Sequence, residues 1–175
     1  PSILLEEGWF GWPVAIDGDR AIVADFWDNV NGKQSGAAYV FARNGTTWFE
    51  EAKLLAGDGA PIDNFGSAVA ISGTTAVVGA RYDDNNAGSA YVFTRAGGTW
   101  TQQSKLQAGD GTADAQLGSA VALNGDRIIV GAPGAALSSP MDGAAYLFAR
   151  NGSTWTAESK VVPMGGGGQS FFGAS

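Results

Sequence analysis

A repeated pattern with a period of about 50 residues constrains this sequence more than any other feature. The pairs Phe10-Gly11, Phe65-Gly66, Leu117-Gly118 and Phe172-Gly173 recur along the chain. Each of the three copies between them carries a Gly followed by a Lys at one fixed separation: Gly36 and Lys53, Gly88 and Lys105, Gly143 and Lys160. Only the loop before that Gly changes length. A fixed period of this size is typical of repeat architectures, in which one structural unit stacks on the next.

Each copy contains four short segments that are typical of β-strands. In the second copy these are residues 66–71, 74–79, 88–93 and 99–106, which are rich in Val, Ala, Tyr and Trp. Asn-Gly, Asp-Gly, Ser-Gly or Gly-Gly pairs join the first segment to the second and the third to the fourth, as tight hairpins require. The pattern predicts an all-β fold: a β-propeller segment of three four-stranded antiparallel blades, with aromatic side chains packed between neighbouring blades.

The repeated Phe-Gly pair, the sequence Gly131-Ala132-Pro133 and an Ala-Tyr-Val-Phe segment followed by Trp resemble FG-GAP repeats. That family is best known from the propeller of integrin alpha subunits and is common in bacterial surface proteins. The resemblance runs from Phe10 to Gly173 and implies a propeller that works in adhesion or ligand binding, outside the cell or at its surface. Many family members carry an Asp-rich calcium loop between the first two strands. Here that connection is a two-residue turn with too few oxygen ligands, so those calcium sites are not carried over.

The repeat boundaries divide the chain into three blades with an incomplete unit at each end. Residues 1–9 are expected to end the outer strand of a preceding blade, and 172–175 to begin a following one. Between them lie blade 1 (10–64), blade 2 (65–116) and blade 3 (117–171). Such a segment is open at both ends, so we expect assembly edges there, at Ile3, Leu4, Leu5, Phe171 and Phe172. Either the segment belongs to a longer propeller, or several copies complete one another.

The composition excludes several classes of function. The net charge is −7, which disfavours nucleic acid and anionic membrane surfaces as partners. The chain has no His and no Cys, so it cannot form a Cys/His zinc site, a Ser-His-Asp triad or a thiol nucleophile on its own. No run of 18 apolar residues is present, so no membrane insertion is expected.

Acidic residues gather in the loops on one face of the predicted blades. Most of this charge is expected to be a solvated surface. Calcium is the one cofactor that the sequence suggests, because Ca²⁺ prefers oxygen ligands. The first candidate site is Asp83, Asp84, Asn85 and Asn86, and the second includes Asp25 and Asp28. No spacing template for calcium is met at either place.

Two further sets of residues are candidate contact or modification sites. Trp9, Trp12, Phe26 and Trp27 belong to the first copy alone and could stack on a sugar ring or cover an interface between blades or subunits. Asn44 and Asn151 fit the N-glycosylation pattern, although the hairpin turn itself also favours Asn-Gly.

Arginines follow the third strand in every copy, at Arg43, Arg95 and Arg150. Because they recur in all blades, we expect a structural role for them, such as pairing with neighbouring blades.

The sequence therefore favours a non-enzymatic, extracellular structural or adhesive module whose blades mediate protein–protein contacts or self-assembly. Its partner would be a copy of itself or the rest of a longer propeller. The alternatives are a lectin-like propeller that binds glycans through the tryptophans, and a glycosidase that uses paired carboxylates.

Overall fold

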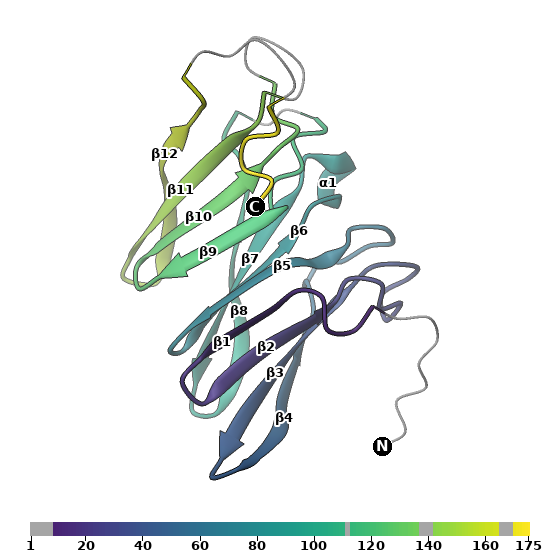
Figure 1. Ribbon diagram of the computed structural model, residues 1–175, viewed down its shortest axis with the longest axis vertical. Helices are drawn as coiled ribbons and strands as arrows, with labels where there is room; N and C mark the ends of the chain where they lie inside the picture. The colour runs from purple at the N-terminus through teal and green to yellow at the C-terminus, as the bar shows by residue number, and fades with distance from the viewer. Residues whose placement is uncertain (1–8, 111–112, 137–141, 165–169) are drawn as a thin grey trace.

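Three separate antiparallel sheets of four strands each make up the computed structural model, which describes residues 9–110, 113–136, 142–164 and 170–175 (Figure 1). The first sheet contains β1 (Val14–Asp17), β2 (Arg20–Asp25), β3 (Ala37–Asn44) and β4 (Thr47–Leu54). The second contains β5 (Phe65–Ser72), β6 (Thr75–Ala80), β7 (Ser89–Ala96) and β8 (Thr99–Leu106). The third contains β9 (Ala120–Asn124), β10 (Arg127–Ala132), β11 (Ala144–Asn151) and β12 (Thr154–Val161).

Each sheet is a simple meander in which consecutive strands pair, so the prediction of an all-β stack of propeller blades is confirmed. The three blades fan out side by side, with their hairpin turns at one end and their longer loops at the other (Figure 1). The one helical element in the described ranges, α1 (Asp83–Asn86), is a single turn in the loop between β6 and β7. Over the residues that the structure describes, the three sheets form an open stack and do not close on themselves.

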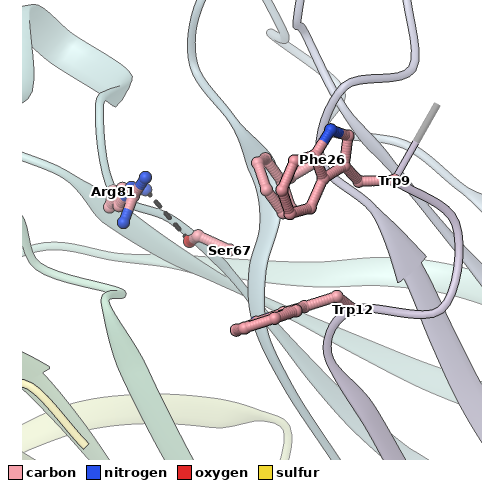
Figure 2. Close-up of a pocket in the computed structure, with 5 residues that line it drawn as sticks. All are labelled: Trp9, Trp12, Phe26, Ser67 and Arg81. Atoms are coloured by element: carbon pink, nitrogen blue, oxygen red, sulfur yellow. Dashed lines mark hydrogen bonds between the residues drawn. The ribbon is translucent and has the colours of Figure 1, made fainter. Parts of the chain in front are cut away.

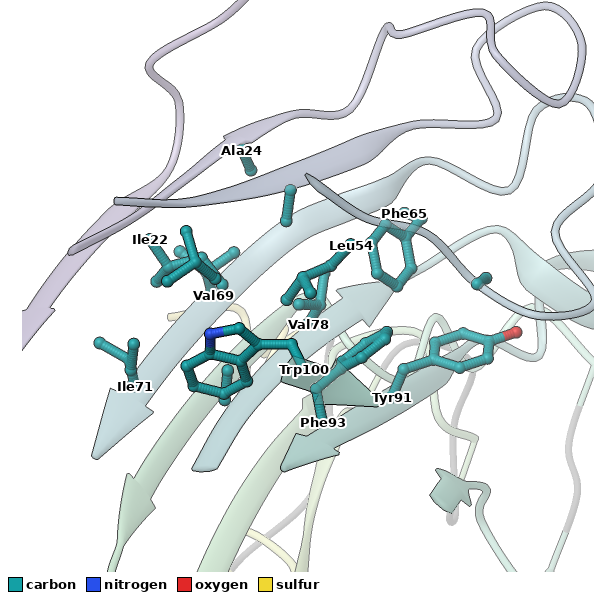
Figure 3. Packing of buried hydrophobic residues seen from close by; sticks show 14 of the residues in the cluster. Ile22, Ala24, Leu54, Phe65, Val69, Ile71, Val78, Tyr91, Phe93 and Trp100 are labelled. Carbon is teal, nitrogen blue, oxygen red and sulfur yellow. The ribbon is translucent and has the colours of Figure 1, made fainter. Parts of the chain in front are cut away.

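The hydrophobic core lies between the blades. Side chains alternate along a strand, so each sheet sends one set toward the preceding blade and the other toward the following blade. In β6, Val78 packs against blade 1 and Val77 packs against blade 3. Figure 3 shows the first interface, where the Phe65 ring lies edge-on to Tyr91 and Phe93, at centroid distances of 5.5 and 5.9 Å. Truncating a buried residue of this size typically costs about 3–5 kcal/mol of folding stability.

The repeated glycines have a steric reason. Gly36, Gly88 and Gly143 pair in parallel with the Phe or Leu of the next Phe-Gly pair. The backbone N–H of Phe65 donates to the Ser35 carbonyl at 3.0 Å, and the N–H of Leu117 donates to the Ala87 carbonyl at 2.9 Å. A Cβ at Gly36, Gly88 or Gly143 would overlap the carbonyl oxygen of that next residue. These positions therefore let the backbone of one blade lie directly against the backbone of the following blade.

Both ends of the stack leave apolar side chains uncovered. We define the N-terminal face as Phe10, Val14, Ile16 and Trp48 of blade 1, all exposed. We define the C-terminal face as the exposed Ile129 and Val161 and the partly exposed Leu147 of blade 3. Ile129 is 40% exposed, whereas Val77, which occupies the same place in blade 2, is 0% exposed.

The expected assembly edges are partly visible. Phe171 and Phe172 are exposed, and Phe172 pairs with Gly143 as Leu117 does with Gly88. Ile3, Leu4 and Leu5 lie outside the described residues.

Candidate functional site

The aromatic residues that are particular to the first copy lie together. Trp9 stacks on Trp27 at a centroid distance of 6.3 Å and an interplanar angle of 24°, and Trp9 also lies 6.3 Å from Trp12. Trp9, Trp12 and Phe26 line a cavity of about 190 Å³, which Ser67 and Arg81 of blade 2 complete. Figure 2 shows Arg81 and Ser67 across from the three rings.

The residues from blade 2 were not identified from the sequence. Ser67 stands in the second copy where Trp12 stands in the first, and the smaller side chain leaves room for the cavity. This difference between the copies is the sequence signal that could have identified Ser67. The Nε atom of Arg81 is buried and has no hydrogen-bond partner, although the backbone N–H of Arg81 donates to Ser67 Oγ at 3.3 Å. The cavity therefore combines aromatic faces from blade 1 with Ser67 and Arg81 from blade 2.

The carboxylates proposed for calcium are engaged with protein cations. Lys105 Nζ lies 2.8 Å from Asp83 Oδ2 and 2.9 Å from Asp84 Oδ2. Asn86 Nδ2 donates to Asp114 at 3.0 Å. Asp84, Asn85 and Asn86 all have positive φ, a conformation that Asp and Asn tolerate better than other side chains.

The second candidate site is also internally bonded. Asp25 accepts a hydrogen bond from the backbone N–H of Trp27, and Asp28 accepts one from the N–H of Val30. Among the residues that the structure describes, no group of three or more acidic side chains is arranged to hold a metal ion. Calcium binding stays a prediction that depends on displacing these contacts.

A tyrosine, a lysine and an aspartate form a cluster in every blade. In blade 1 the Tyr39 hydroxyl donates to Asp28 at 2.8 Å and Lys53 Nζ lies 2.7 Å from the same carboxylate oxygen. Tyr91 and Lys105 of blade 2 meet Asp83 of the same blade and Asp58 from the loop before it, and Tyr146 and Lys160 of blade 3 meet Asp110 from the loop before that blade. Each lysine also lies over the ring of its tyrosine, 5.2–5.5 Å from the centroid.

The lysine and tyrosine of these clusters lower the pKa of Asp28 and Asp110, which they contact. Burial would raise the pKa of Asp28, but hydrogen bonds from Lys53 and Tyr39 outweigh it and hold that pKa below its ordinary value. The hydrogen bond from Lys160 likewise lowers the pKa of Asp110. Asp63 differs, because burial raises its pKa while its carboxylate accepts the Ala60 backbone N–H at 2.6 Å. Carboxylates with a lowered pKa are poor proton donors near neutral pH.

Glu51 is the centre of a polar cluster between blades 1 and 2. Its carboxylate accepts hydrogen bonds from Arg20 of blade 1 at 3.1 Å, and from Arg95 and the Trp100 indole of blade 2 at 2.7 and 2.9 Å. Burial would raise the pKa of Glu51, but these three donors together lower it to about 2. We call these four residues the Glu51 cluster.

The Glu51 cluster partly confirms the structural role expected for the repeated arginines. Arg95 pairs with Glu51 of the preceding blade. Arg43 and Arg150 instead pair with Asp19 and Asp126, in the first hairpin turn of their own blades.

The two potential glycosylation residues lie where a transferase could reach them. Asn44 ends β3 and Asn151 ends β11, and both are exposed. Gly45 and Gly152 follow them with φ of 61° and 63°, so the turn geometry accounts for the Asn-Gly sequence as well.

Comparison with known proteins agrees with this architecture. The family model for the FG-GAP repeat matches residues 6–41, 48–93 and 100–148, which together span more than half of the chain. The second and third matches each begin in the fourth strand of one blade and end in the third strand of the next, so they cross the interface between blades. No curated protein matches the sequence. In the described ranges, no helix has the length and hydropathy needed to cross a membrane.

Proposed function

Because the chain belongs to the FG-GAP repeat family, we propose that it is a non-enzymatic, extracellular adhesive module whose open blade faces bind copies of the same protein. FG-GAP repeats generally mediate protein–protein or adhesive contacts and occur in extracellular and surface proteins. The observation that carries the proposal is the exposure, at both ends of the stack, of apolar positions that are buried at the interfaces inside it.

The internal interfaces show what these positions do when they are covered. The partners of Val77 and Leu106 in blade 2 are residues of blade 3, and both side chains are buried. Ile129 and Val161 are their equivalents in blade 3 and stay exposed. Beside Ile129 lies an apolar hollow of about 140 Å³, lined largely by Ala and Gly. An apolar surface with small residues at its centre accepts larger side chains from a partner.

Sedimentation velocity across a range of protein concentrations tests this function. Self-association through the open faces predicts a mass that rises with concentration, and a monomer for Ile129→Asp, which places a charge on the C-terminal face. Thr74→Asp is the matched control, because Thr74 lies in the exposed β5–β6 turn of the middle blade. A wild-type chain that stays monomeric at every concentration would refute self-association.

The aromatic cavity supports a second function, glycan binding. Indole faces stack on sugar rings, and the Arg81 guanidinium that helps line the cavity carries hydrogen-bond donors for a sugar hydroxyl or carboxylate. If saccharides bind there, tryptophan emission should shift on titration with neutral or acidic oligosaccharides, and Trp12→Ala should abolish the shift. An unchanged spectrum for both classes of sugar would eliminate this candidate.

The non-enzymatic part of the proposal rests on the state of the carboxylates. A glycosidase needs one carboxylic acid whose pKa is raised beside a second carboxylate. Asp63 has a raised pKa, to which burial and the charges of Asp83 and Asp58 contribute, but Lys105 pairs with both of those neighbouring carboxylates. Turnover of aryl glycosides that is lost in Asp63→Asn, which removes an aspartate whose pKa is raised by burial, would overturn this view.

A further inference from the structure

The Glu51 cluster shows how polar residues join two blades. Arg20 and Glu51 come from blade 1, and Arg95 and Trp100 come from blade 2. Glu51 is the extra residue of a β-bulge, since the register of β3 and β4 shifts between Val40 and Phe41. A bulge re-aims a side chain relative to its strand. The Glu51 side chain is only 10% exposed, so blade 2 nearly completes its surroundings.

The same bulge occurs in all three blades, with different residues. In blade 2 the extra residue is Gln103, whose side-chain oxygen accepts the Trp155 indole N–H at 3.0 Å. In blade 3 it is Glu158. At both internal interfaces, the tryptophan of the next blade thus donates a hydrogen bond to the bulge residue. Only the bulge residue Glu51 also pairs with an arginine of the next blade, Arg95.

Blade 3 carries the first half of such a cluster on the open C-terminal face. Arg127 begins β10 as Arg20 begins β2, and its guanidinium donates to both carboxylate oxygens of Glu158 at 3.2 Å. The Glu158 side chain is 39% exposed, compared with 10% for Glu51. Within the described part of the chain, no residue supplies the indole and second guanidinium that Glu51 receives.

Blade 1 carries the second half on the open N-terminal face, although Arg43 also pairs with Asp19 of its own blade, where blade 2 has Thr74. Arg43 pairs with Trp48 across β3 and β4, as Arg95 pairs with Trp100 across β7 and β8. The Arg43 guanidinium lies 5.8 Å from the centroid of the Trp48 ring. Trp48 is 41% exposed, whereas Trp100 is 8% exposed.

We propose that two copies of the chain dock head to tail so that Arg43 and Trp48 of a second copy bind Glu158 of the first. This inference rests on the proposed self-association. It adds which residues of the two copies meet and how the two blade faces are aligned. Around this contact, the Val14 and Ile16 side chains of the second copy would cover Ile129 and Val161, as blade 3 covers blade 2. Unlike faces meet in such a contact, so copies either close into a ring or extend as a filament.

Charge exchange tests the pairing in the full chain. We expect Glu158→Arg and Arg43→Glu each to weaken self-association, measured by sedimentation equilibrium, by about 30-fold or more. The double variant E158R/R43E restores the opposite charges and should associate within a few-fold of the wild type. Thr74→Arg, in the turn of the middle blade, is the control and should leave the association constant unchanged.

The outcomes separate this inference from the function on which it rests. If the wild type associates and both single variants associate equally well, the Glu158 contact is wrong and self-association stands. If the wild type is a monomer, both the contact and the self-association are wrong.

Circular dichroism melting of each variant shows whether the blades are folded. Glu158→Gln provides a milder change that keeps an acceptor for the Trp48 indole. This variant should associate more weakly than the wild type and more strongly than E158R; equality with the wild type would also overturn the pairing.

Discussion

Replacing Glu51 by Gln removes one charge from the Glu51 cluster while keeping the size of the side chain and an acceptor for Trp100. Arg20 and Arg95 then face each other across the interface between blades 1 and 2 without their shared carboxylate. The cost of this change can be worked out from the pKa of Glu51, which lies at about 2 in the folded protein against an ordinary value of 4.5.

A difference of this size in the pKa of one carboxyl corresponds to about 3 kcal/mol of folding stability at neutral pH. The cluster lies at the rim of the interface and keeps some contact with water, so we expect a loss of about 2 kcal/mol in Glu51→Gln. For a chain of this length the midpoint of thermal unfolding should fall by about 4–8 °C.

The effect should depend on pH in one direction. The folded pKa lies below the unfolded pKa, so the stabilisation is present above about pH 5 and is lost as the pH falls through 4.5 toward 2. Urea unfolding of the wild type and of Glu51→Gln should therefore differ by about 2 kcal/mol at pH 7 and by less than about 1 kcal/mol at pH 3. Glu50→Gln, at the exposed neighbouring position, should change stability by less than about 0.5 kcal/mol. Equal stability of wild type and Glu51→Gln at pH 7 would refute the reasoning.

Three further predictions concern other parts of the stack. Gly88→Ala should lower the free energy of unfolding by about 3 kcal/mol or more, because its Cβ would overlap the backbone of blade 3; Gly45→Ala, which has positive φ and open space, should cost about 1 kcal/mol. If the Asp83–Asn86 loop binds calcium, the melting midpoint should fall when a chelator is added, and an unchanged midpoint would eliminate that site. If Asn44 and Asn151 are acceptors, expression in a glycosylating host should add glycan mass that Asn→Gln substitutions remove, and a mass equal to that of the polypeptide would show that the turns are unmodified.

The strands and their stacking could be predicted because they depend on local signals that repeat. Asn-Gly and Gly-Gly turns, Val and Ala in the strands, and the aromatic third and fourth strands carry the same information in each copy. The grouping of Trp9, Trp12, Phe26 and Trp27 was also predictable, since all four belong to the first copy.

The polar clusters could not be predicted by aligning the copies. The carboxylate that meets Tyr39 comes from the loop between β2 and β3, whereas the one that meets Tyr146 comes from the loop between β8 and β9. Two different positions of the repeat thus occupy the same place in space. Glu51 could not be identified for another reason. A β-bulge shifts the alternation of β4 by one residue, so counting every second residue assigns the Glu51 side chain to the wrong face of the sheet.

The parallel pairing of Gly36 with Phe65 has a mechanical consequence. Tension applied along the chain would pass from residue 36 directly to residue 65 through the backbone hydrogen bonds that join their neighbourhoods, and would bypass β3 and β4. The same shortcut joins Gly88 to Leu117 and Gly143 to Phe172. The chain of the third and fourth strands of each blade is therefore not extended until these backbone hydrogen bonds break. Stretching single molecules should then release the two outer strands of a blade in one step.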